Sequence, residues 1–233
     1  DLGDEHVRTG YPIVYTSGDS VFQIAAHEEV VDLKTLYRWC ETARNILTGR
    51  DLVGRVIARP FIGDSNGNFK RTPNRHDYSA TPPENTLLDN AKIAGLDVLG
   101  IGKIEDLFAG KGLTRAIHTE SNLDGITKTI KAIRKNLQGK NVERGIIFTN
   151  LVDFDAKFGH RRNIEGYFKA LKEFDEKIPE IMGYMDEDDV LFITADHGND
   201  PSYSGSDHTR EDVPLIVYGN CIRRGVDLGL RNS

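Results

Sequence analysis

The stretch "VLFITADHGND" (residues 190–200) joins a run of apolar residues to a set of reactive side chains. "VLFI" is typical of a buried strand, and Asp196 and His197 follow it side by side, with Gly198 directly after them. A strand needs neither a carboxylate nor an imidazole at its end. In open α/β sheets, ligands bind beyond the carboxyl ends of the strands. The stretch therefore predicts an α/β fold with a polar site at a strand end.

Strands and helices alternate around this stretch. Short apolar runs, typical of strands covered on both faces, recur after residue 86 as "LDVLGIG" (96–102), "RGIIFTNL" (144–151) and "PLIVYG" (214–219). One helical stripe begins after a candidate cap at Ser121 and is expected to end at Gly139. A second predicted helix is marked by Ile164, Phe168, Leu171, Ile178 and Ile181. This alternation predicts a mostly parallel sheet flanked by helices.

The first third of the chain has a different pattern of predicted strands and helices. "PIVYT" (12–16) and "VGRVIARPF" (53–61) are predicted strands, and between them Leu36, Cys40 and other apolar residues recur at helical spacing. Residues 63–86 are dense in Gly, Pro, Asn and Ser and are predicted to form a long loop. The sequence thus predicts a smaller α/β domain over residues 1–85 and a larger one over residues 86–233.

Composition excludes several classes of function. The 233 residues carry a formal net charge of −6, which argues against a nucleic-acid-binding face but leaves room for a local phosphate site. No run of about 18 apolar residues is present, so no membrane partner is expected. Cys40 and Cys221 are far apart and are expected to be idle thiols in a reducing, cytoplasmic setting. The chain begins without Met and stops soon after a strand-like run, so we expect a fragment.

Three polar clusters are expected at one edge of the predicted sheet. Asp153 and Asp155 follow one strand, with His160 opening a helix; Asp196 and His197 follow the next; and His208 precedes the last. A single such histidine is more often structural, and Asp196 could simply cap the following segment. Together these side chains are ligands suited to Zn²⁺ or Mn²⁺. Neighbouring residues point in different directions, so two ions about 4 Å apart could share this edge, as in two-metal phosphoryl chemistry.

Basic residues could supply the other half of a phosphate site. Arg55 and Arg59 lie in one predicted strand, Arg71 and Arg75 in the long loop, and Lys103 after another strand. Arginine binds phosphate through two parallel hydrogen bonds, and lysine binds it as a point charge. Any one of these residues alone could equally be a solvated surface charge.

Several of these segments, taken together, resemble one family. "NLVDFDAKFGHRRN" (150–163), "ITADHGNDPSYSGSDHTRE" (193–211), "GRVIARPF" (54–61), "RTPNRHDY" (71–78) and "YTSGDSVFQIAAHEE" (15–29) are similar to phosphopentomutases of the alkaline phosphatase superfamily. The resemblance implies an alkaline-phosphatase-like core and a small α/β cap domain. It also implies an isomerase that interconverts ribose or deoxyribose 1-phosphate and 5-phosphate through a phosphothreonine and a sugar bisphosphate, which also serves as activator. Two Mn²⁺ ions are the implied cofactors.

The resemblance also implies roles for individual residues. Asp155, His160 and His208 would hold one metal ion, and Asp196 and His197 would contribute to the other. The implied substrate-binding residues are Ser17, Asp19, Arg55, Ile57, Arg71 and Lys103. The nucleophilic threonine and a further metal-binding aspartate are expected before residue 1, and a last core segment after Ser233. A metal-dependent phosphatase, a phosphoglycerate mutase and an inactive metal- and phosphate-binding fragment remain alternatives.

Overall fold

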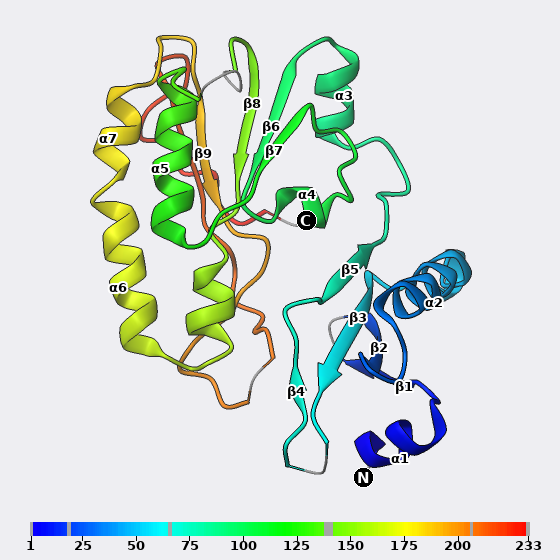
Figure 1. The fold of residues 1–233 in the computed structure, drawn as a ribbon. Helices are drawn as coiled ribbons and strands as arrows, with labels where there is room; N and C mark the ends of the chain where they lie inside the picture. The colour runs from blue at the N-terminus through cyan, green and yellow to red at the C-terminus, as the bar shows by residue number, and fades with distance from the viewer. Residues whose placement is uncertain (1, 18–19, 65–66, 138–141, 206, 232–233) are drawn as a thin grey trace. The chain divides into compact units, whose positions relative to one another are not determined.

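The computed structural model describes residues 2–17, 20–64, 67–137, 142–205 and 207–231 (Figure 1). The chain divides into two compact units. The first comprises residues 1–90 and 105–112, and the second comprises residues 91–104 and 113–233. Within the described residues, no helix is both long enough and apolar enough to span a bilayer.

A five-stranded sheet forms the centre of the first unit. Its strands run in the order β1-β2-β3-β4, with β5 also paired to β3. Strands β2 and β3 are parallel, an arrangement that the crossover through helix α2 permits, and the other pairs are antiparallel. The elements are α1 (Leu2–Thr9), β1 (Ile13–Ser17), β2 (Val21–His27), α2 (Leu33–Ile46), a 3₁₀ turn (Gly49–Asp51), β3 (Arg55–Ile62), β4 (Lys70–Arg71) and β5 (His76–Ser79).

Helix α2 covers one face of this sheet, which confirms the helix predicted from apolar spacing. Asp32 begins it, because its Oδ1 accepts a hydrogen bond from the backbone N–H of Thr35. Leu36 and Cys40 are completely buried against a sheet face that includes Val56. Burial raises the pKa of the Cys40 thiol to about 12. The first unit therefore has an apolar core of its own.

The prediction that residues 63–86 form one long loop was wrong in part. This segment contains β4 and β5, which pair antiparallel with β3 over two and four residues. Such short strands lie between Gly67 and Pro82 and carry no alternating apolar pattern, so the backbone pairing leaves little trace in the sequence.

A parallel sheet lies in the second unit, as the sequence predicted. Strand β6 (Asp97–Ile101) is central and pairs in parallel with β7 (Arg115–Ile117) and β8 (Gly145–Thr149). The last two predicted strands, β9 (Leu191–Thr194) and β10 (Leu215–Tyr218), depart from this pattern because they pair antiparallel with each other. The helices described after residue 86, two of which begin or end in the first unit, are α3 (Leu87–Ile93), α4 (Ile104–Leu107), α5 (Asn122–Ile133), α6 (Ile164–Asp175) and α7 (Ile178–Gly183).

Helices α5, α6 and α7 pack together on one side of these strands (Figure 1). Ser121 caps α5 as predicted, because its hydroxyl accepts a hydrogen bond from the N–H of Asp124. Ile126 and Ile130 are buried against Ile181 of α7. The helix ends at Ile133, and Gly139, the predicted stop, lies outside the described residues.

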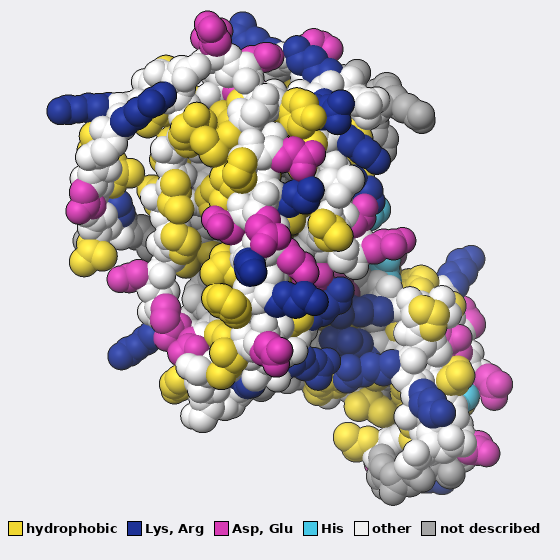
Figure 2. Space-filling view, turned by 90° about the vertical axis from the view of Figure 1, so that its left-hand side faces the viewer, with side chains coloured by type: hydrophobic (Ala, Val, Ile, Leu, Met, Phe, Trp, Pro, Cys, Tyr) yellow, Lys and Arg dark blue, Asp and Glu magenta, His cyan; other side chains and the backbone are white. Residues whose placement is uncertain are grey.

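The second predicted helix is in fact two helices, α6 and α7. Pro179 stands at the start of α7 and lacks the N–H that a continuous helix would require there. The predicted stripe was also wrong for α6, because Ile164, Phe168 and Leu171 are exposed. The helix instead buries Ala170 and partly buries Phe174. Other apolar side chains are visible on the surface as well (Figure 2).

Candidate metal centre

A single turn of π-helix places two of the predicted ligands on the same side. The turn spans Phe154–Gly159, and the N–H of His160 donates to the carbonyl of Asp155 over 3.0 Å. In an α-helix, residues five apart point about 140° away from each other, whereas the wider π turn stacks them more closely. His160 therefore ends this turn, and α6 begins only at Ile164, so the expectation that His160 opens a helix was wrong.

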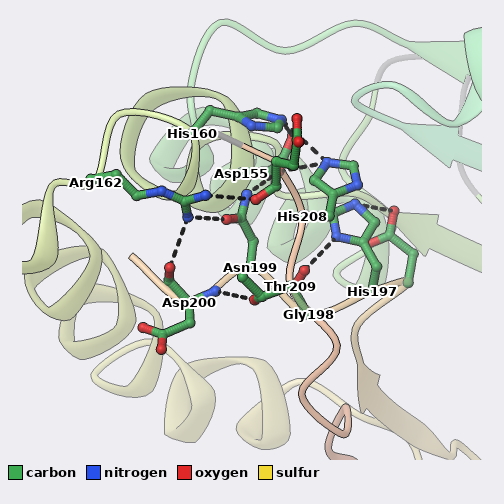
Figure 3. Close-up of polar contacts among 11 residues, drawn as sticks. Asp155, His160, Arg162, His197, Gly198, Asn199, Asp200, His208 and Thr209 are labelled. Atoms are coloured by element: carbon green, nitrogen blue, oxygen red, sulfur yellow. Dashed lines mark hydrogen bonds and ion pairs between the residues drawn. The ribbon is translucent and has the colours of Figure 1, made fainter. Parts of the chain in front are cut away.

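Three of the predicted ligands meet in a small triangle (Figure 3). The Nε2 atom of His160 lies 3.3 Å from Oδ2 of Asp155, and the Nε2 atom of His208 lies 3.3 Å from Oδ1 of the same carboxylate. The same two Nε2 atoms are 3.2 Å from each other. Side chains 48 residues apart in sequence thus aim their donor atoms at one point.

His197 lies directly beside this triangle. Its ring stacks on the His208 ring with centroids 3.7 Å apart and planes inclined by 17°. One ligand atom each from Asp155, His197 and His208 can be chosen so that all three lie within 4.8 Å of one another. Asp196 is the outermost predicted ligand, with its carboxylate 3.7 Å from Nε2 of His197.

The segment that carries His208 returns alongside the end of β9. Gly198 and Thr209 form an antiparallel bridge, in which the Thr209 N–H donates to the Gly198 carbonyl over 3.1 Å. A Cβ atom at Gly198 would lie 2.8 Å from the Thr209 carbonyl oxygen and 2.9 Å from the Glu211 backbone. The glycine therefore allows two backbones to approach closely enough to bring His208 to Asp155.

The donor set fits a divalent cation. A cation bonded at about 2.1 Å holds neighbouring ligand atoms about 3.0–3.4 Å apart in tetrahedral or octahedral geometry. The separations of 3.2–3.3 Å among Asp155, His160 and His208 fall in this range. Imidazole nitrogen and carboxylate oxygen also suit Zn²⁺ and Mn²⁺. The three side chains are 29–35% exposed, so a cation could reach them from solvent.

Asp153 is bound to Asn122 and Lys157 and does not join the ligand cluster around Asp155. Its Oδ2 accepts from the backbone N–H of Asn122 over 2.9 Å, while its own N–H donates to Oδ1 of Asn122 over 2.8 Å. Lys157 approaches its other carboxylate oxygen at 3.1 Å. These contacts anchor the start of α5 to the segment after β8, so the Asp153 carboxylate is engaged within the protein.

The predicted substrate-binding residues belong to both units. Arg55, Ile57 and Arg59 alternate along β3 and share the sheet face opposite to the buried Val56 and Ala58. Burial and the neighbouring Arg75 and Arg71 guanidinium groups lower the pKa of Arg59. Figure 2 shows how Lys and Arg side chains gather on the visible surface.

The other members of this set are placed as follows. Ile57 is buried, Arg71 in β4 is exposed, and Lys103 is partly buried in the second unit after β6. Ser17 ends β1. Asp19 lies outside the described residues.

Two residues of this centre escaped the sequence analysis. Asn199 donates from Nδ2 to Oδ1 of Asp155 over 2.6 Å, and Arg162 donates from Nη1 to Oδ1 of Asn199 over 2.9 Å. Asn199 lies within the same "ADHGN" motif as two predicted ligands, which is the only signal in the sequence that points to it. Arg162 carries no comparable signal, because its partners lie 37 or more residues away.

Several curated proteins similar to this chain are described as phosphopentomutases. The chain is 58% identical to a phosphopentomutase of Alkaliphilus metalliredigens, 56% to one of Clostridioides difficile and 60% to one of Caldanaerobacter subterraneus subsp. tengcongensis. Each alignment covers all 233 residues of this chain, which spans 58% of the length of these curated relatives.

Two further comparisons concern the fold and the superfamily. The structure of PH0037 protein from Pyrococcus horikoshii is similar over 70% of this chain and 48% of that one, with 15% identity and a TM-score of 0.48, too distant to inform the site. A family model described as the Metalloenzyme superfamily matches residues 23–233. The cluster of Asp155, His160, His197 and His208 lies inside this matched region, and the chain belongs to the metalloenzyme superfamily.

Proposed function

We propose that this chain supplies the metal centre and the sugar-phosphate-binding domain of a phosphopentomutase. Such an enzyme interconverts ribose or deoxyribose 1-phosphate and the corresponding 5-phosphate. The observation that carries the proposal is the convergence of Asp155, His160 and His208 within 3.3 Å of one another. Identities of 56–60% to the phosphopentomutases named above support it.

The metal centre is proposed to hold Mn²⁺. Asp155, His160 and His208 would hold one ion, and Asp196 and His197 would contribute to a second. Bound cations neutralise charge on the oxygens of a phosphoryl group in transfer. The side chains of this chain would fix the coordination geometry in advance, because two of the ligands are locked on one π turn. The phosphorylated threonine nucleophile implied by the resemblance would come from outside these 233 residues.

Recognition of the pentose phosphate is assigned to the basic residues. Lys103 would add a further positive charge. The residues proposed to surround the sugar phosphate are Ser17, Asp19, Arg55, Ile57 and Arg71. Arg55 lies 3.4 Å from a carboxylate oxygen of Asp77, and the same carboxylate accepts two hydrogen bonds of 2.6 Å from Arg75. A sugar bisphosphate would serve as intermediate and activator. We place this chemistry in the cytoplasm, without a nucleic-acid or membrane partner.

The test is a turnover assay on the full-length protein with Mn²⁺. We expect ribose 5-phosphate to form from ribose 1-phosphate in the presence of a catalytic amount of sugar bisphosphate, and chelation of the metal to stop the reaction. Release of inorganic phosphate without isomerisation would identify a phosphatase. Interconversion of 2- and 3-phosphoglycerate would identify the other mutase class, and metal binding without turnover would identify an inactive binding protein.

A further inference from the structure

Arg162 occupies an unusual backbone position next to the metal centre. Its φ is +53°, a left-handed conformation that is uncommon for residues other than glycine. The turn is closed by hydrogen bonds of 3.0 Å from Arg162 N–H to the Gly159 carbonyl and from Asn163 N–H to the Phe158 carbonyl. The conformation reverses the chain before α6 and directs the Arg162 side chain toward Asn199 and Asp200 of the segment that follows β9 (Figure 3).

The Arg162 guanidinium makes four hydrogen bonds to that segment. Nη1 donates to Oδ1 of Asn199 over 2.9 Å and to the carbonyl of Asp200 over 2.8 Å. Nη2 donates to the carbonyl of Asp207 over 2.6 Å, and Nε donates to the carbonyl of Gly205. Asp207 directly precedes His208, so one side chain holds both ends of the loop that delivers this histidine.

Asn199 transmits the position of Arg162 to Asp155. The side chain is buried, and both ends of its amide are engaged: Oδ1 accepts from Arg162, and Nδ2 donates to Oδ1 of Asp155 over 2.6 Å. A Cβ atom at Gly159 would lie 2.4 Å from Nδ2 and 2.6 Å from Cγ of Asn199. Only a glycine at this position leaves room for the amide to reach the carboxylate.

We infer that Arg162 is a positioning residue of the metal centre, and that Asn199 is the link through which it orients Asp155. Arg162 holds the π turn and the loop 199–207 together, so that the ligand atoms are arranged before a cation arrives. Outer hydrogen bonds to ligands commonly set metal affinity in this way. Lysine could not replace the residue, because its donors radiate from one atom and cannot reach four acceptors spread along a loop. The inference rests on the proposed metal centre.

The decisive experiment compares Mn²⁺ binding to the full-length protein and to two matched variants by calorimetric titration. We expect Arg162→Lys to weaken binding roughly 10- to 100-fold and Arg161→Lys, at the exposed neighbouring arginine, to leave it unchanged. The visible spectrum of bound Co²⁺ should change in Arg162→Lys, because the ligand geometry changes. Wild-type affinity and an unaltered Co²⁺ spectrum in Arg162→Lys would overturn the inference.

A second measurement separates this inference from the proposed function. Amide hydrogen exchange in residues 198–209, measured without metal, should be faster in Arg162→Lys than in Arg161→Lys. If the wild-type protein bound no Mn²⁺, the proposed metal centre would fail, and equal exchange in the two variants would reject the positioning role as well. Should Arg162→Lys not fold, Asn199→Ser replaces it: weaker Mn²⁺ binding supports the link to Asp155, and unchanged binding removes it.

Discussion

The core of the first unit and the metal centre of the second are built by different means. Leu36, Cys40 and Val56 are fully buried, and the core they form is made of apolar contacts between α2 and the sheet. The side chains of Asp155, His160 and His208 remain 29–35% exposed and are held by polar contacts, most of which join residues 44 or more positions apart. The apolar core and the proposed metal ligands thus reside in separate sets of residues, and we expect changes to one set to spare the other.

Asp155→Asn is expected to have the largest effect on the metal centre while leaving the core of the first unit unchanged. The substitution keeps the shape of the side chain but removes the charge that a cation requires. Since loss of an outer hydrogen bond to a ligand already costs roughly 10- to 100-fold, we expect turnover and Mn²⁺ affinity of the full-length protein to fall by at least about 100-fold. Hydrogen exchange in α2 and β3 should stay unchanged. Turnover at the wild-type rate would show that the Asp155 carboxylate is not required for the reaction.

Arg71→Ala tests whether the first unit also takes part in the chemistry. Loss of a charged phosphate contact costs roughly 1.5–3 kcal/mol, which corresponds to about one to two decades in rate. The melting temperature should barely move, because surface substitutions usually change stability by less than about 0.5 kcal/mol. Arg50→Ala is the matched control, since the Arg50 side chain is 94% exposed and outside the proposed site. Equal turnover in both variants would remove Arg71 from substrate recognition.

The same contrast explains which features could be predicted from the sequence. Helix α2 and its buried face follow from local apolar spacing and a local cap at Asp32, so they were predicted correctly. The metal-ligating character of Asp155, His160, His197 and His208 follows from their positions in polar segments next to predicted strands. The structure brings these four side chains together. Their roles as ligands stay a prediction until a cation is observed.

Features that depend on distant partners could not be predicted. The exposed stripe of α6 has the same spacing as a buried one, and only the packing of Ala170 and Phe174 shows which face is covered. The antiparallel pairing of β9 with β10 depends on the direction in which the chain returns between them, and a run of apolar residues does not specify that direction. Arg162 is one arginine among many in the sequence, and its four acceptors lie in a loop far along the chain.

Gly159→Ala should produce a smaller effect, confined to the metal centre. The added methyl group would collide with the Asn199 amide, which Arg162 and burial prevent from moving freely. We expect Mn²⁺ affinity to fall by up to roughly tenfold. Gly183→Ala in α7 provides the control, because a Cβ atom there meets nothing within 4 Å. Calorimetric titration of both variants measures the difference, and identical affinities would show that the close approach at Gly159 is dispensable.

The smallest effect concerns the stability of the first unit at alkaline pH. Burial raises the pKa of Cys40 from 9.0 to about 12, and burial also raises that of Tyr78 from 10.0 to about 12. Both groups stay protonated in the folded state while they ionise in the unfolded chain. Stability of this unit should therefore fall as pH rises above about 9 and continue to fall toward 12.

Denaturant titrations between pH 8 and pH 11, followed through hydrogen exchange of α2, measure this slope. In Cys40→Ala the loss of stability with pH should be shallower, whereas Cys221→Ala, at the exposed cysteine, should retain the full slope. The same slope in both variants would mean that Cys40 ionises as readily in the folded protein as in the unfolded chain.

The most direct test of the metal centre is an anomalous-scattering measurement at the manganese absorption edge, on crystals of the full-length protein grown with Mn²⁺. We predict a peak about 2.0–2.2 Å from an Asp155 carboxylate oxygen and from Nε2 of both His160 and His208, a range measured for zinc with the same donor types. A peak elsewhere in the molecule, or no peak at these three side chains at saturating Mn²⁺, would contradict the account.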